Sequence, residues 1–572
     1  MYYFFRVLFL ISLFVPFFIM EKFGVIWNFE NFPTILGLSL QTIVGLSIYL
    51  YTDDETNDKD WEVPVGYLLL YAGLAGAYLS GKTILLPIFW ELSTFGALIV
   101  YSGLPFHEKR TKSLIALFTG SGISAILLAT WVYLPNGNTF GIYSLLLGLL
   151  IKSAFSITHS WYPDLHEGSP SSTSATYSGV ALNLPILLFM QHFDPMWLPG
   201  FSYKILVPIA GIGIFLGGVT AFFSRDVKRI LAYSTIEKSN FIWLCAFLYK
   251  FWISNPSENM ENFANMFLIL FYLTILHHSI SKTYQFLMYG FMGDLAQNNI
   301  LDEIKGIGRL TGLPVVLIGL GTFSFAALPG TLGFLSESTY LYIISRLIDL
   351  PEGKALVILP SMIIFILGLV MGLGAHLKLY LSIALSIPEK KLKDHLEGYR
   401  ITKNFFNTFM YLSYLLLMMP LLINVLFLYF DLPFVDAEFK DRFRIIFFIN
   451  ILFNLYFLFI VYGKFSHVIT IRKGWDCGNK YNGAELSIPA SVISDPLSNS
   501  IGITMSRKEQ DSLIDLTIKK QILRFLDLGK YWIRQVESGD TSNYLAFSST
   551  ALLFTLLLIF FFRLLNGAIW NI

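Results

Sequence analysis

The amino-acid sequence predicts an all-α polytopic membrane protein, and three observations support this fold class. Of the 572 residues, 55% are hydrophobic and only 14% are charged, whereas soluble domains carry about 25% charged residues. The mean hydropathy is +0.61. Apolar stretches long enough to cross a bilayer as helices recur along the whole chain. The net charge of +1 predicts no nucleic-acid partner and no strongly charged partner.

The apolar stretches predict about 14–16 transmembrane helices. In chain order they are residues 2–20, 31–51, 64–81, 83–103, 112–133, 138–158, 174–191, 203–223, 232–250, 263–290, 313–330, 334–350, 356–386, 405–430, 443–463 and 546–566. The first is long and bulky and shows no small-residue cleavage site. We therefore interpret it as a retained helix rather than a signal peptide.

These helices divide the chain into five expected parts. They are N-terminal transmembrane helices (1–60), an ion-translocating core (61–390), C-terminal transmembrane helices (391–470), an extramembrane segment (471–545) and a last transmembrane helix (546–572). In residues 505–537, apolar side chains fall on one helical face and Lys and Arg on the other, which predicts an amphipathic helix outside the bilayer core. It is either an ordinary surface helix or one that leads to the last span.

Lysine and arginine gather in three loops between the predicted helices, residues 107–112, 224–230 and 302–309. Counting helices puts these loops on one side, which we expect to be cytoplasmic. Two loops do not fit this count. The acidic loop 53–62 falls on the basic side, and the basic loop 389–403 falls on the outer side.

The chain has two cysteines, Cys245 and Cys477. They are too few for an iron–sulfur cluster or a structural zinc site, which need about four ligands. One thiol in the motif Trp475–Asp476–Cys477–Gly478 is better explained as structural than as half a metal site. If the protein serves redox chemistry, we expect no cofactor in this chain, and the cofactors belong to a partner.

Ionisable residues inside apolar segments are the most informative feature, because a charge at mid-bilayer costs roughly 2.5–3.5 kcal/mol on insertion scales. They are Glu91, Lys152, His277, His278, Lys282, Glu337, His376 and Lys378. Any single one is as readily explained by snorkelling or a structural ion pair. Their recurrence in separate helices favours a proton path, because membrane proton relays are chains of carboxylate, imidazole and amine groups.

Two broken helices are expected beside these charges. Residues 149–178 begin as an apolar helix that contains Lys152 and then change to Pro, Gly and Ser. A second break, at Pro329 and Gly330, precedes Glu337. Backbone that leaves the helix at membrane depth is tolerated where protein or a water-filled cavity satisfies it, and transporters place such breaks at ion sites. The pattern therefore predicts two half-channels.

Three polar residues follow the first break: His159, Asp164 and Glu167. They form either a proton entrance or a solvated turn.

The ordered motifs resemble a known family. They are Trp90–Glu91–Leu92, Lys152–Ser153–Ala154, "HSWYPD" (159–164), "EGSP" (167–170), "DVKRILAYSTIE" (226–237), the pair His278 and Lys282, and "GFLSE" (333–337). In this order they look like the antiporter-like subunits of complex I, Mrp-type cation/proton antiporters and membrane-bound hydrogenases, over roughly residues 60–390. Within that superfamily, "SPSSTSATYSGVALN" (169–183), "AYSTIEKSN" (232–240), "WDCG" (475–478) and "SDPL" (494–497) resemble hydrogenase-4 component B and the formate hydrogenlyase membrane subunit 3.

The resemblance implies a fold of two inverted five-helix repeats, each with a discontinuous helix. It also implies that Glu91 pairs with Lys152 as the gate of the first half-channel and that Lys282, with His278, is the central relay. Glu337 would be the terminal residue of the second half-channel, and Lys378 matches a lysine common in the hydrogenase branch.

The sequence departs from this family at two positions after the first break. The family usually has Lys or His there, and this chain has Tyr177 and Asn183, neither of which titrates near pH 7. The first half-channel would then be bridged by water or impaired. The resemblance also implies an N-terminus about one helix shorter than in the complex I relatives.

Three functions remain open from the sequence. The first is a proton- or Na⁺-translocating subunit of an oxidoreductase complex in the cytoplasmic membrane of a prokaryote. Its partners would be membrane and peripheral subunits that hold a nickel–iron site and iron–sulfur clusters. The second is a complex I-like subunit, or a transporter without redox partners, either an Mrp-type cation/proton antiporter subunit or an anion-uptake partner subunit. The third is a membrane scaffold that does not pump.

Overall fold

The computed structural model describes residues 1–22, 31–55, 61–103, 110–198, 200–254, 260–348, 352–399, 401–429, 445 and 448–456. In these ranges the chain is helical, and β pairing is limited to an isolated bridge between Asp226 and Ile300. Nine of the described helices are long and apolar enough to cross a membrane, which confirms the predicted fold class. The predicted segments 471–545 and 546–572, with Cys477, lie outside the described residues.

The first part of the bundle leads up to and through the first broken helix. It comprises α1 (Tyr2–Ser12), α2 (Val15–Lys22), α3 (Phe32–Glu55), α4 (Glu62–Leu79), α5 (Leu85–Ser102), α6 (Arg110–Tyr133), α7 (Thr139–Lys152), α8 (Trp161–Glu167), α9 (Ser171–Thr176), the π-helical turn η1 (Tyr177–Ala181) and α10 (Asn183–His192). A short 3₁₀ turn, η2 (Pro195–Trp197), follows.

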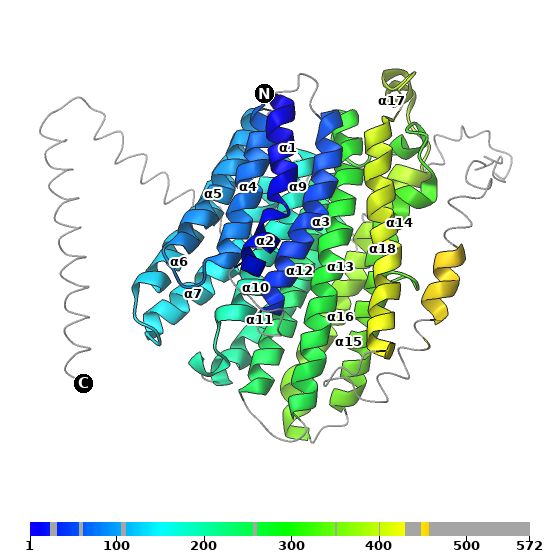
Figure 1. Ribbon diagram of the computed structural model, residues 1–572. Coiled ribbons are helices and arrows are strands. Elements are labelled where there is room, and N and C mark those ends of the chain that lie inside the picture. The colour runs from blue at the N-terminus through cyan, green and yellow to red at the C-terminus, as the bar shows by residue number, and fades with distance from the viewer. Residues whose placement is uncertain are drawn as a thin grey trace, which may run out of the picture. The chain divides into compact units, whose positions relative to one another are not determined.

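The second part contains the second broken helix. It comprises α11 (Gly200–Phe223), α12 (Val227–Ile253), α13 (Met260–Leu295), the 3₁₀ turn η3 (Ile307–Arg309), α14 (Val315–Phe325), α15 (Leu332–Ile348), α16 (Glu352–Tyr380), the π-helical turn η4 (Leu381–Leu385), α17 (Lys390–His395) and α18 (Lys403–Tyr429). In Figure 1, α5, α6 and α7 lie at the left and α14 and α18 at the right, with α3 and α12 between them.

The first break is a Schellman motif at the end of α7. The helix ends at Lys152, and Ala154, two residues later, has a left-handed backbone with φ of 53°. The N–H of Ala154 donates to the carbonyl of Ile151 at 3.2 Å, and the N–H of Phe155 donates to the carbonyl of Leu150 at 3.1 Å. These two bonds satisfy the last carbonyls of the helix, so α7 can stop inside the protein.

The second break repeats this geometry at the end of α14. The helix ends at Phe325, and Ala327 has φ of 50°. The N–H of Ala327 donates to the carbonyl of Ser324 at 3.2 Å, and the N–H of Leu328 donates to the carbonyl of Phe323 at 3.0 Å. The same motif at both predicted breaks supports the view that the core contains two related halves.

Ala154 makes the first break testable, because glycine usually occupies this left-handed position. We expect Ala154→Val to lower the free energy of unfolding by about 2 kcal/mol or more, since the site is fully buried and a β-branched residue strains both packing and backbone. Ala154→Gly should stay within about 1 kcal/mol of the wild type. Thermal unfolding of the detergent-solubilised protein checks this, and equal stability of the two variants would contradict the assignment.

The structure corrects the predicted topology. Segments 313–330 and 334–350 were counted as two spans, but α14 and α15 are the two arms of one broken helix, so the loop 389–403 changes side. At the end where α14 begins, Lys305 pairs with Glu389 at 3.1 Å, and the N–H of Gly306 donates to the carbonyl of Ser382 at 2.7 Å. The basic loop 389–403 therefore lies at the same end as the loop 302–309.

Candidate functional site

Glu91 and Lys152 meet through one hydroxyl group. Glu91 lies on α5, Ser121 on α6 and Lys152 on the last turn of α7. The ammonium group of Lys152 donates to Ser121 Oγ at 2.5 Å, and Ser121 Oγ donates to Glu91 Oε1 at 3.0 Å. Lys152 is only 2% exposed. The carbonyl end of α7 favours a cation there, so the broken helix itself helps to hold this charge.

The two departure positions lie around the π-helical turn η1. The ring centroid of Tyr177 is 5.9 Å from the ammonium nitrogen of Lys152, and among the described residues its buried hydroxyl has no hydrogen-bond partner. The amide of Asn183 donates to the carbonyl of Gly179 at 2.9 Å. A phenol and an amide thus lie after Lys152 where the family usually has titratable groups.

The π turn also fixes the orientation of His278. A π turn interrupts the α-helical bonding pattern, and the carbonyl of Ser178 in η1 accepts a bond from Nε2 of His278 on α13 at 3.1 Å. Because a carbonyl can only accept, Nε2 carries a hydrogen, and in the neutral imidazole Nδ1 then keeps its lone pair. Among the described residues, Nδ1 has no partner. His278 is therefore oriented to accept a proton on the side away from the turn.

Lys282 lies one helical turn further along α13 and is fully buried. Its ammonium group donates to the hydroxyl of Ser234 and to the carbonyl of Leu231 at 3.3 Å, both on α12. The same group lies 4.4 Å from the ring centroid of Phe325. The central lysine is held by neutral dipoles and an aromatic face, rather than by a directly bonded carboxylate.

Phe325 is a common neighbour of four titratable side chains, at the point where α14 breaks. Its ring lies 4.9 Å from that of His277 and stacks on that of His376 at 4.5 Å. The ammonium groups of Lys282 and Lys238 lie 4.4 and 5.7 Å from its centroid. Phe325 could not be predicted from the sequence, because an apolar residue in an apolar segment does not stand out.

Glu337 pairs with a lysine that the sequence analysis missed. Lys238 on α12 lies 3.2 Å from Glu337 Oε1 on α15 and 3.8 Å from Oε1 of its neighbour Glu237. Both Glu237 and Lys238 are buried. They lie inside the predicted apolar segment 232–250, so the criterion that selected Glu91 applied to them as well. Because Glu237 and Lys238 belong to the family motif at residues 232–240, they were not counted among the candidate path residues.

Gly372 on α16 makes room for Glu237. A β-carbon at Gly372 would lie 2.0 Å from Glu237 Oε2, which is well inside contact distance. Among the described residues, that oxygen has no hydrogen-bond partner.

The last two predicted path residues differ in their surroundings. His376 stacks on Phe325, and its Nδ1 accepts a bond from the amide of Gln285 at 3.0 Å. Lys378 donates to the carbonyl of Ser224 at 2.6 Å and to that of Phe222. These carbonyls are at the end of α11, so Lys378 caps a helix, as cations often do.

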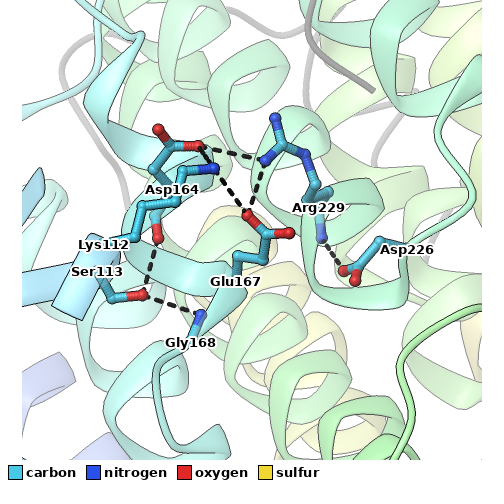
Figure 2. Close-up of polar contacts among 7 residues, drawn as sticks. All are labelled: Lys112, Ser113, Asp164, Glu167, Gly168, Asp226 and Arg229. Carbon is cyan, nitrogen blue, oxygen red and sulfur yellow. Dashed lines mark hydrogen bonds and ion pairs between the residues drawn. The ribbon is translucent and has the colours of Figure 1, made fainter. Parts of the chain in front are cut away.

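Two of the three predicted entrance residues lie in a four-charge cluster, shown in Figure 2. Asp164 and Glu167 on α8 face Lys112 of α6 at 2.9 and 3.1 Å, and Arg229 of α12 at 3.2 and 3.0 Å. The third residue, His159, is bonded through Nδ1 to the carbonyl of Ser156. Asp164 and Glu167 are thus engaged by two cations.

Further bonds in Figure 2 tie this cluster to the backbone. Ser113 Oγ donates to the carbonyl of Asp164 at 2.8 Å and accepts from the N–H of Gly168 at 2.9 Å. Asp226 caps α12 by accepting from the N–H of Arg229 at 3.0 Å. The cluster therefore holds the short helix α8 against both α6 and α12.

The comparisons with known proteins agree with this arrangement. Residues 112–348 match the family described as NADH:quinone oxidoreductase/Mrp antiporter, transmembrane. The matched residues make up less than half of the chain. A protein of Staphylococcus saprophyticus named an antiporter subunit, mnhA2, is 21% identical over 367 residues, which cover 60% of this chain and 46% of that protein. Its Staphylococcus aureus counterpart is 23% identical and covers 53% and 42%. This chain spans less than half the length of these relatives.

Two solved structures are similar to this chain in fold. One belongs to the membrane-bound sulfane sulfur reductase, an archaeal respiratory membrane complex, with a TM-score of 0.65, 17% identity and coverage of 95% of this chain and 94% of the other. The second is the Mrp complex from Dietzia, with a TM-score of 0.58, 15% identity and coverage of 92% and 54%. Within the described ranges, no group of three or more His, Cys, Asp or Glu residues could hold a metal ion.

Proposed function

We propose that this chain is a proton- or cation-translocating subunit of a multisubunit membrane complex in the cytoplasmic membrane of a prokaryote. The observation that carries the proposal is a line of buried and half-buried charges through the helix bundle. It begins at Glu91 and Lys152 beside the first break and ends at Lys282, Lys238 and Glu337 beside the second. Burying charged groups in a membrane protein is unfavourable in free energy, and a set of such groups is typical of an ion path.

The physical mechanism is electrostatic. Adding or removing a proton at one end changes the stability of the charge on the next buried group, because interactions between charges are strong where water is excluded. Lys238 is well placed for this step, since it lies between Lys282 and the carboxylate of Glu337. Proton movement along the line then needs only small side-chain displacements and intervening water.

The orientation follows from the basic loops. The residues of the loops 224–230, 302–309 and 389–403 lie at one end of the bundle, joined by contacts such as that between Lys305 and Glu389. By the positive-inside rule this end faces the cytoplasm. The acidic loop after α3 remains an exception at the same end.

The kind of complex has two candidates. Sequence motifs favour a hydrogenase-4 or formate hydrogenlyase-like complex, with the nickel–iron site and iron–sulfur clusters in its other subunits. The motifs at 475–478 and 494–497 that support this branch lie outside the described residues. The similarity to Mrp-type antiporter subunits favours a cation/proton antiporter at least as well.

Purification of the native complex separates these candidates. Hydrogenase-like or quinone-reductase subunits that copurify with this chain would support the redox-driven complex, whereas antiporter subunits without redox partners would support the antiporter. Proton movement in sealed vesicles tests the function common to both. We expect vesicles that contain the complex to move protons, and vesicles from cells lacking this chain to lose that movement. Equal movement in both would leave the chain as a scaffold.

A further inference from the structure

His166 is a buried imidazole that the predicted path does not include. It lies on α8 and is fully buried. Its ring stacks on Phe286 at 4.6 Å and meets the ring of Tyr162 edge-on at 4.4 Å. In the part of the chain that the structure describes, neither ring nitrogen has a hydrogen-bond partner.

A buried imidazole without hydrogen bonds lowers the stability of the fold if it serves packing alone. Buried polar groups are nearly always hydrogen-bonded, and an unsatisfied one costs about 1–3 kcal/mol. A phenylalanine would make the same ring contacts without that cost. The imidazole is therefore retained for something that a phenyl ring cannot do, and water is the partner that a buried polar site of this kind accommodates.

On one side of His166, an ion pair leads to the surface. Lys228 donates to Asp294 Oδ1 at 2.9 Å, and the Asp294 side chain is 41% exposed. The second oxygen of Asp294 accepts from the hydroxyl of Ser171. Lys228 also donates to the carbonyl of Ser169, three residues after His166, at 2.8 Å. The stretch of chain that carries His166 is thus bonded to an ion pair that reaches the solvent.

On the other side, hydroxyl groups lead to the central lysine. The hydroxyl groups of Ser178 and Thr235 bond to each other at 2.9 Å, and Thr235 is next to Ser234, which accepts a bond from Lys282. Ser178 also carries the carbonyl that orients His278. Phe286, on which the ring of His166 stacks, lies one helical turn after Lys282 on α13. The neighbours of the imidazole therefore adjoin the surface ion pair on one side and the central lysine on the other.

We propose that His166 is a proton relay residue that connects Lys282 with the end of the molecule that holds the loops 224–230 and 302–309. This inference rests on the proposed function and adds the inlet to it. A neutral imidazole takes up a proton on one nitrogen and releases the other proton from the second nitrogen, so each transfer leaves the ring neutral again. The inlet lies beside the four-charge cluster, whose carboxylates are engaged by Lys112 and Arg229.

Two substitutions test the relay in the intact complex. His166→Phe keeps the aromatic packing but carries no proton, and His166→Gln keeps hydrogen bonding to water but does not titrate. We expect either variant to assemble and to lower the initial rate of proton movement in sealed vesicles about tenfold or more. The matched control is His192→Phe. His192 is the last residue of α10 and is not part of the proposed inlet, so this variant should leave the rate unchanged.

Failure of this inference can be distinguished from failure of the proposed function. If Lys282→Met stops proton movement but His166→Gln proceeds at the wild-type rate, the inlet is elsewhere and the proposed function stands. If neither substitution changes the rate, the proposed function itself fails. If His166→Phe does not assemble, His166→Gln decides alone, because its amide retains the polar character of the site.

Discussion

Replacing Lys282 by methionine is expected to stop ion translocation while the complex still assembles. Methionine fills a similar volume, but it removes the ammonium group that Ser234 and the carbonyl of Leu231 hold. Proton transfer by a positioned group contributes about 10²- to 10⁴-fold to rate, so we expect a fall of at least about 100-fold. The initial rate of proton movement in sealed vesicles, at equal amounts of assembled complex, measures this.

Lys250 supplies a matched control for that prediction. It is also a buried lysine, on α12, and donates to the carbonyls of Met190 at 3.2 Å and Phe193 at 2.6 Å. It caps α10 and lies off the line of charges. Lys250→Met should reduce stability but not the rate per assembled complex. Equal loss of rate in both variants would show that buried lysines matter for folding rather than for the path.

Arg229→Met is expected to give the largest loss of stability. It removes the α12 cation from Asp164 and Glu167, whose side chains are each only 11% exposed and which still face Lys112. Removing one partner from a buried ion-pair network costs about 3–5 kcal/mol. Because the cluster anchors α8, ion translocation should fall as well. Thermal unfolding of the detergent-solubilised protein measures the change in stability.

A nearby arginine provides the comparison. Arg225 pairs with Asp302 at 3.9 Å, and their side chains are 19% and 26% exposed. A partly exposed pair contributes about 0–1 kcal/mol, so Arg225→Met should shift the unfolding midpoint much less. A shift as large as that of Arg229→Met would contradict the view that burial of the cluster decides its importance.

Charged residues in apolar segments could be predicted from sequence, because burial makes each one conspicuous. This logic led to Glu91, Lys152, Lys282 and Glu337, and the structure places these four at the two broken helices. The partners that connect them were less visible. Ser121 is a common small residue in a membrane helix, and its role as a bridge depends on the packing of α6 against α5 and α7.

The positions of the breaks could be predicted from Pro and Gly, but their geometry could not. Ala154 and Ala327 adopt left-handed conformations that are unusual for alanine, and they carry no sequence signal. The topology failed for a related reason. Hydropathy does not distinguish two arms of one broken helix from two separate spans, so the loop 389–403 was assigned to the wrong side.

Other assignments needed three-dimensional contacts. Lys378 was selected as a charge in an apolar segment, and only the contact with the end of α11 identifies it as a helix cap. Asp164 and Glu167 were considered as an open entrance, and only the approach of Arg229, some sixty residues further along the chain, shows how they are engaged.

The central claim is that ions cross through the line of charges that ends in Glu91 and Glu337. The most direct test is proton uptake by sealed vesicles that contain the native complex, comparing the wild type with Glu91→Gln and Glu337→Gln at equal assembly. Each substitution keeps the shape of the side chain and removes its charge. The account predicts that both variants assemble and lose proton uptake. Unchanged uptake in both assembled variants would contradict it and would leave this chain as a membrane anchor.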